Sequence, residues 1–457
     1  MITFRNLKIN SEELDTFRSI MTGNRRNSLS WLRYQMVLPE YPEEACVRLE
    51  SEDERHANNE SFTRSISNLW SVLKQWENEG VHHRLRIDLK DIYSRSDWKA
   101  SDETKRWVEA ETGKSDYELF KRRLEGSQPR LLHPSLLPNL SNVRSLRVKV
   151  DGYRKPVPAT GPELTASLPM LEEAVWKFPE DVHVETTSQR RLNRTAFTEA
   201  MSRVQLQPRA YAIINMKNEP PFDERSECES LIPPGLKYDP FSASLRIFSQ
   251  TLTCLTLKAH VEQTLFWPSR YEENALFPSW PSLRDLDVEF NMVAPSGAWY
   301  FTGQYEAHED DDPAEEVIGD DTETYNYSNF RVNPDPKMMN PLVAAFANAV
   351  RRMPVIEHYA LWCDIWEYKF RIAYYKPGDA ADWGYEVPEE VDFDKHKDDD
   401  DAHLQCRRLY YEVGFEWRPR SDVAEALRST GKEKYGGEVY ERFLDRRYAV
   451  IPRADYE

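Results

Sequence analysis

The sequence predicts an α/β fold, namely an irregular leucine-rich-repeat-like solenoid with parallel strands on a concave face and helices on a convex face. Two observations predict it: one strand phrase recurs five times, and prolines Pro169, Pro281 and Pro354 stand just before three of its copies. The five copies are Val143-x-x-Leu146-x-Val148, Leu171-x-x-Ala174-x-Trp176, Leu252-x-x-Leu255-x-Leu257, Leu283-x-x-Leu286-x-Val288 and Ile356-x-x-Tyr359-x-Leu361.

Each phrase offers one apolar face, because residues two apart lie on the same side of a strand. A single unit cannot bury that face alone, so the units are expected to stack as adjacent parallel strands of a right-handed solenoid. Leu146, Leu257 and Val288 should then share one face. A solenoid core grows lengthwise, so 457 residues suit one elongated body as well as two or three domains. A single compact enzyme fold is the competing outcome.

The first ninety residues predict strand, helix and strand in alternation. Asn10 and Glu13 form a capping box, and Gly23 is the expected end of the helix that follows it. Apolar residues keep helical spacing from Phe62 to Gly80. The expected elements are strands at 3–9, 30–38 and 85–89, helices at 10–21 and 62–80, and an acidic loop at 40–60.

The remaining chain predicts further irregular repeats and a helical cap. The expected elements are a short helix at 117–124, a helix at 195–204, a strand with a degraded phrase at 209–216, an aromatic strand pair at 292–303, a helix at 339–352, a strand at 406–417, and cap helices at 421–429 and 437–446. The predicted domains are a capping region with the first repeat (1–93), irregular repeats (94–300), an acidic disordered insertion (301–335), and C-terminal repeats with the cap (336–457). A second charged loop is expected at 389–403.

Charge and composition exclude several classes of partner. The formal net charge of -18 repels a phosphate backbone, which argues against nucleic acid and anionic membranes. No run approaches the roughly 18 apolar residues that span a bilayer, and MITFRNLKINSEELD lacks the layout of a secretory signal. Five widely spread cysteines fit reduced thiols better than a disulfide framework, so we expect a cytoplasmic or nuclear protein.

The sequence carries no catalytic or metal-binding signature, so neither enzyme, cofactor nor metal is expected. Calcium loops, HExxH pairs, C-x-x-C pairs, P-loops and G-x-S-x-G elbows are missing. The acidic clusters at 310–321 and 398–401 are expected to be solvated loops. Paired carboxylates for glycoside chemistry stay open, because their separation depends on the fold.

The outward face of the stacked strands is the expected partner site. Alternation sends out the neighbours of the buried positions, and the candidate partner-binding residues are Arg147, Lys149, Val175, Lys177, Thr256, Lys258, Asp287, Glu289 and Trp362. A basic strip on an acidic chain suits an acidic peptide or a phosphorylated group. Alternatively, the basic residues only keep a sheet soluble. Trp362 and Val175 suit a binding hot spot, unless a neighbouring loop covers them.

Four segments carry a family resemblance: TFRNLKINSEELDTFRSIM, FTRSISNLWSVLKQWENEGVHHRLRIDL, LLPNLSNVRSLRV and SLPMLEEAVWKF. They resemble the body of fungal F-box proteins with divergent leucine-rich-repeat-like C-terminal regions, chiefly over residues 1–300. The resemblance implies a substrate receptor of an SCF-type ubiquitin ligase, in which an F-box docks the adaptor Skp1. The chain begins with what resembles the segment after the box, so Skp1 is an expected partner only if an F-box lies outside this chain. A lost box and a repeat-only interaction protein are the alternatives.

Overall fold

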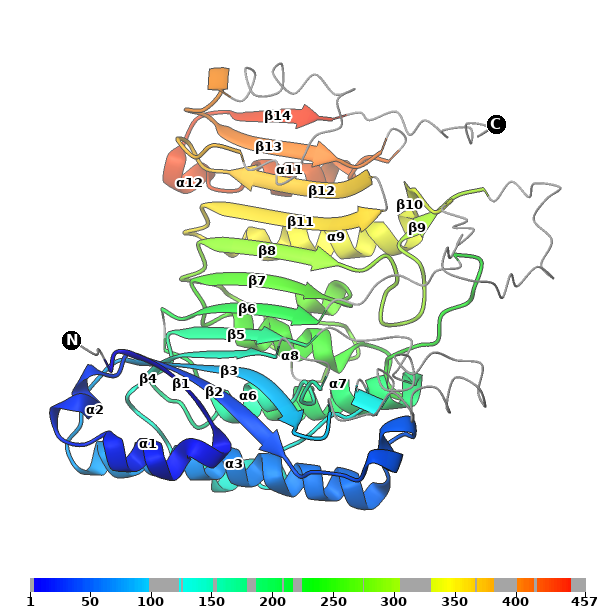
Figure 1. The fold of residues 1–457 in the computed structure, drawn as a ribbon. Coiled ribbons are helices and arrows are strands. Elements are labelled where there is room, and N and C mark those ends of the chain that lie inside the picture. Colours follow the sequence, from blue (N-terminus) through cyan, green and yellow to red (C-terminus); the bar gives the residue numbers. More distant parts are fainter. Residues whose placement is uncertain are drawn as a thin grey trace, which may run out of the picture. The chain divides into compact units, whose positions relative to one another are not determined.

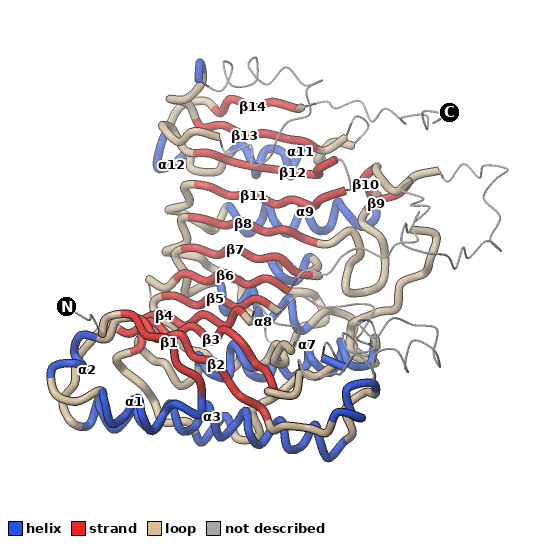
Figure 2. The backbone as a smooth tube through the Cα atoms, viewed as in Figure 1, coloured by secondary structure: helices blue, strands red, loops and turns tan. Residues whose placement is uncertain are grey.

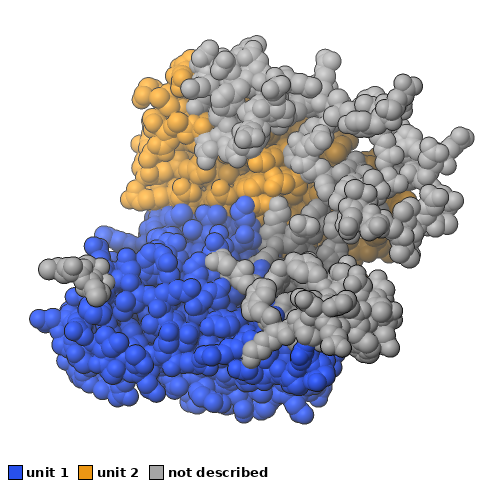
Figure 3. Space-filling model, viewed as in Figure 1, with its two compact units in different colours: residues 1–218, 240–259, 280–283 blue, residues 219–239, 260–279, 284–457 orange. Residues whose placement is uncertain are grey.

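A computed structural model describes the chain as two compact units (Figure 3). The first comprises residues 1–218, 240–259 and 280–283, and the second comprises residues 219–239, 260–279 and 284–457. The described residues are 4–97, 123–124, 126–150, 154–178, 186–207, 209–216, 224–273, 275–304, 330–365, 368–381, 401–414 and 417–444. Most of the predicted acidic insertion (305–329), most of the second charged loop (389–400) and most of the predicted helix at 117–124 lie outside them.

The first unit is built on a parallel sheet (Figure 1). Each strand pairs in parallel with the next along the chain. The strands are β1 (Asn6–Asn10), β2 (Trp31–Leu38), β3 (Leu85–Ser94), β4 (Val143–Lys149), β5 (Glu173–Lys177), β6 (Tyr211–Met216) and β7 (Cys254–Ala259). The strand predicted at 209–216 is confirmed as β6, which lies between β5 and β7.

Helices of the first unit alternate with its strands (Figure 2). They are η1 (Ser11–Glu13), α1 (Leu14–Ile20), α2 (Asn24–Ser28), η2 (Glu43–Val47), α3 (Glu52–Asn78), η3 (Pro134–Leu136), α6 (Thr160–Thr165), α7 (Thr187–Met201) and α8 (Pro240–Ser249). The capping box of Asn10 and Glu13 is confirmed. Gly23 does not end the first helix, since it is the N-cap of the unexpected helix α2.

Helix α3 corrects the prediction of a loop at 40–60. The helix starts at Glu52, ten residues before Phe62, because Ser51 and Glu54 form a second capping box. The first turn also contains three acidic residues, Glu52, Asp53 and Glu54. Their negative charges stabilise the helix, because the helix dipole is positive at this end. The acidic composition of residues 52–60 was therefore compatible with a helix, and the prediction of a loop there is wrong.

The core of the first unit lies between the sheet and its helices. Trp176 on β5 is fully buried and packs against Phe197 of α7 and Phe248 of α8, with ring centroids 6.0 and 5.7 Å apart. A Cβ at Gly161 would lie 2.8 Å from the Trp176 ring, so only glycine lets α6 approach this closely. Leu146 and Leu257 are likewise fully buried. The recurring phrase thus predicts the buried side of the sheet correctly.

The second unit has a mixed sheet. Strands β8 and β11 are parallel, β11, β12 and β13 are antiparallel, and β13 and β14 are parallel. The strands are β8 (Asp285–Phe290), β11 (His358–Ile365), β12 (Tyr368–Tyr375), β13 (Arg407–Glu412) and β14 (Val439–Phe443), beside a separate pair, β9 (Phe301–Thr302) and β10 (Asn333–Pro334). The helices are η4 (Gln263–Leu265), α9 (Pro336–Val350), α11 (Ser421–Arg428) and α12 (Lys432–Tyr435).

Two predictions for the second unit are wrong. The cap helix expected at 437–446 is the strand β14, because Gly436 and Gly437 have positive φ and end α12, and β13 offers an edge for pairing. The strand pair expected at 292–303 is reduced to one bridge between Val293 and Trp299 and the two-residue strand β9. The fold as a whole is mixed α/β, with mostly parallel strand pairing.

Candidate functional site

The side of the first unit's sheet opposite its buried core carries a row of lysines. Lys149 of β4 pairs in register with Lys177 of β5, which pairs with Asn215 of β6, which pairs with Lys258 of β7. We call these four residues the lysine row. Neighbouring strands lie about 4.8 Å apart, so the backbone of Lys258 is about two such steps from that of Lys177. Asn215 separates these two lysines, which the five phrases alone did not indicate.

The lysine row is cationic and reachable from solvent. Lys149 is exposed, and Lys177 and Lys258 are half-buried. Lys149 and Lys177 lie in register on adjacent strands, so two lysines begin side by side in a chain of net charge -18. Ammonium groups concentrated in this way attract carboxylate and phosphate oxygens, which makes the row a candidate anion site.

A second row of the same face begins at Arg147, which has a carboxylate partner. Arg147 forms an ion pair with Glu173, and Ser145 Oγ donates a 2.6 Å hydrogen bond to the same carboxylate. Thr256 continues this row and is half-buried. Val175, expected to be exposed, is only 4 % exposed, because larger side chains on the neighbouring strands can cover a short aliphatic one. Val175 is therefore not an accessible hot spot.

Cations and an aromatic ring also gather near the start of β2 and β3, which sequence reasoning missed. The guanidinium groups of Arg33 and Arg86 lie 3.8 and 4.3 Å from the centroid of the Trp31 ring. Arg86 also donates two hydrogen bonds of 2.7 and 2.8 Å to Asp88, which raise the pKa of the guanidinium. Alternation of Trp31 with Arg33 along one strand was the available signal. Asp88 balances Arg86, so this cluster is less suited to an external anion than the lysine row.

The remaining predicted residues lie in the second unit. Trp362 of β11 donates its indole N–H to Asp287 Oδ1 of β8 over 2.7 Å. Burial raises the pKa of Asp287, and this hydrogen bond opposes the rise. Glu289, expected to be exposed, is only 1 % exposed, since it lies in register with the large side chain of Trp362. The structure thus brings Asp287, Glu289 and Trp362 together, with Glu289 buried and the other two half-buried.

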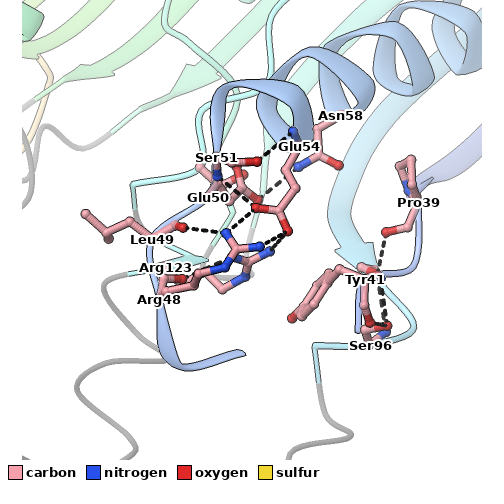
Figure 4. A network of polar contacts seen from close by, with 12 residues as sticks. Pro39, Tyr41, Arg48, Leu49, Glu50, Ser51, Glu54, Asn58, Ser96 and Arg123 are labelled. Carbon is pink, nitrogen blue, oxygen red and sulfur yellow. Dashed lines mark hydrogen bonds and ion pairs between the residues drawn. The ribbon is translucent and has the colours of Figure 1, made fainter. Parts of the chain in front are cut away.

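A polar network at the start of α3 also concentrates charge (Figure 4). Glu54 accepts hydrogen bonds from Arg48, from Arg123 and from the Ser51 backbone. Burial alone would raise the pKa of Glu54, but these donors outweigh it and lower the pKa to about 2. Arg48 and Arg123 thus pair with Glu54 at the N-terminus of α3, where Glu54 also caps the helix. We therefore assign this cluster a structural role.

Nothing among the described residues indicates a metal or a membrane. No group of three histidine, cysteine, aspartate or glutamate side chains in the described ranges is placed to hold a metal ion. Among the described helices, none combines the length and apolar character needed to cross a bilayer. The described cysteines Cys228, Cys254, Cys363 and Cys406 are not joined in disulfides.

Comparison of the chain with protein-family models, with curated proteins and with solved structures found no match.

Proposed function

We propose that the protein is a non-catalytic protein-binding scaffold whose lysine row holds an acidic or phosphorylated segment of a partner. In this proposal the strand and helix repeats are the coils of an irregular leucine-rich-repeat-like solenoid. Such repeats present broad sheet surfaces that suit macromolecular partners. The observation that carries the proposal is the register of Lys149 and Lys177 on adjacent strands, with Lys258 two strands further on.

The chemistry of the row supports an anionic segment as ligand. Ammonium groups form charge-assisted hydrogen bonds with carboxylate and phosphate oxygens, and these are about twice as strong as neutral ones. The rest of the chain is acidic, so it repels acidic partners except where cations are concentrated. Local attraction of this kind on an acidic protein contributes to specificity.

The family resemblance favours one cellular role, that of a substrate receptor of an SCF-type ubiquitin ligase in the cytoplasm or nucleus. A repeat-only scaffold unrelated to ubiquitination is the alternative. Affinity purification of the full-length protein from its source organism separates them. Recovery of Skp1 and a cullin supports the receptor. Their absence, with other partners recovered, supports the free-standing scaffold.

A carbohydrate-active enzyme is the second candidate, and one observation favours it. Asp287 and Glu289 lie two residues apart on β8, hence on one face of that strand, and burial raises the pKa of Asp287. Glycoside hydrolysis requires two carboxyl groups, and the one that acts as the acid has a raised pKa. Hydrolysis of a glycan panel by the wild type, lost in Asp287→Asn and Glu289→Gln, would support this candidate over the scaffold.

A further inference from the structure

The second unit contains a groove beside the exposed side of α9. Pro341, Ala344 and Asn348 recur at helical spacing along that helix and line the groove. Trp267 and Tyr271, from the segment after η4, line it as well. The volume is about 510 Å³, within the range of about 300–1,000 Å³ typical of ligand pockets. Small side chains on the helix thus leave room for one or two large guest side chains.

Exposed apolar groups concentrate around this groove. The described part of the chain has ten large hydrophobic side chains that are exposed, and four of them belong to the segments that form or flank the groove. These four are Leu236, Tyr271, Leu276 and Phe277, which are 45, 42, 86 and 69 % exposed. Phe277 packs on Trp267, with ring centroids 5.5 Å apart. Concentrated apolar exposure of this kind marks an interaction site.

The charges at the groove are positive. Lys237 and Arg270 line it, and the charged atoms of both lie within 5 Å of the centroid of the Tyr271 ring, at 4.9 and 4.7 Å. The Arg352 guanidinium lies 5.5 Å from the centroid of the Trp267 ring. Among the described residues that line the groove, none is a carboxylate. The groove is therefore both apolar and cationic in a chain of net charge -18.

We propose that this groove binds a peptide segment of a partner protein in which an aromatic or branched aliphatic side chain is flanked by carboxylates. The apolar side chain would enter between Trp267 and Ala344, where it loses contact with water. The flanking carboxylates would meet Lys237 and Arg270, which fix orientation and increase the rate of association. The charge complementarity selects an acidic peptide over a basic one.

This site is independent of the lysine row, because it is formed by other residues of another unit. The two can be lost separately. Failure of the lysine row to bind an acidic partner would leave the groove proposal intact, and the reverse also holds.

The test is selection of a random peptide library displayed on phage against the full chain, with affinities of the selected peptides measured by fluorescence polarisation. Peptides with a large apolar residue beside carboxylates should be enriched. Ala344→Trp, which fills the groove, should weaken their binding at least tenfold. Lys237→Glu combined with Arg270→Glu should do the same without altering the core, because both side chains are exposed.

Lys337→Glu is the control for a charge reversal outside the groove, at half the charge change of the double variant, since Lys337 is an exposed lysine on α9 that does not line the groove. It should change affinity less than twofold. Three results would overturn the proposal: enrichment of peptides that lack carboxylates, equal binding to the Ala344→Trp variant, or no enrichment at all. Self-association of the wild type that the groove variants abolish, seen by light scattering, would also overturn it in favour of a second copy of the chain.

Discussion

The indole N–H of Trp70 donates a hydrogen bond of 2.8 Å to Ser167 Oγ, and both residues are buried. Trp70 lies on α3 and Ser167 follows the end of α6, so the bond joins a helix to a segment whose residue is 97 positions away in the sequence. Ser167 Oγ in turn donates to the Leu164 carbonyl over 2.7 Å. The Ser167 hydroxyl therefore accepts a hydrogen bond from the buried Trp70 N–H and donates its own proton to a carbonyl.

Ser167→Ala should destabilise the first unit by about 1–3 kcal/mol, because it leaves the Trp70 N–H buried without its acceptor. Thermal unfolding followed by tryptophan fluorescence measures the change. Ser71→Ala is the control, since Ser71 Oγ makes only an exposed bond to the carbonyl one turn earlier on the same helix. Equal melting temperatures for the two variants would show that the buried bond contributes nothing.

Glu54→Gln should reduce the acid sensitivity of the protein. The pKa of Glu54 is lowered to about 2 in the fold, from an ordinary value of 4.5. A lowered pKa adds stability that is present above pH 4.5 and is lost as the pH falls towards 2. The variant should be less stable than the wild type at pH 7, and the difference should shrink across that window.

Urea unfolding at several pH values follows this difference. Glu52→Gln changes an exposed carboxylate in the same helical turn and is the matched control. A wild-type advantage that stays constant from pH 7 to pH 2.5 would be inconsistent with the Glu54 network.

Glu163→Gln should stabilise the protein at pH 7, whereas Glu54→Gln should destabilise it. Burial raises the pKa of Glu163 on α6 to about 6, so its ionised form is disfavoured in the fold. The favourable contribution is present below pH 4.5 and is lost as the pH rises through 6. The neutral variant should match the wild type near pH 4 and melt at a higher temperature at pH 7. Glu438→Gln, at an exposed position, should melt as the wild type does at both pH values. A Glu163→Gln variant that melts lower at pH 7 would refute the assignment.

The sequence predicted the strands that carry the recurring phrase better than the strands that lack it. Leu146, Leu257 and Val288 follow the recurring phrase, and all three are fully buried. Strand β12 was not predicted, because its run YKFRIAYY has apolar residues at neighbouring as well as alternate positions. Its antiparallel pairing with β11 depends on contacts that a repeat phrase does not encode.

The sequence predicted which face of the sheet carries the candidate site, but not how buried its side chains are. Alternation placed Lys149 and Lys177 in one row, which the register bears out, and Asn215 lies between Lys177 and Lys258 because the degraded phrase also forms a strand. The burial of Val175 and Glu289 could not be predicted in this way. It depends on which large side chains neighbouring strands place beside them, and that requires the register.

The central claim is that the lysine row binds an acidic partner, and a double charge reversal tests it most directly. Lys177→Glu with Lys258→Glu changes the net charge from -18 to -22, because each substitution contributes -2. Arg25→Glu with Arg203→Glu makes the same change at exposed positions outside the sheet and is the matched control.

The measurement is fluorescence polarisation of labelled acidic peptides, with and without phosphoserine, over a range of salt concentrations. We predict that the wild type and the control bind with an affinity that falls as salt rises, and that the row variant binds at least tenfold more weakly, with a smaller salt dependence and unchanged melting. Binding by the row variant equal to that of the control, at every salt concentration, would contradict the claim.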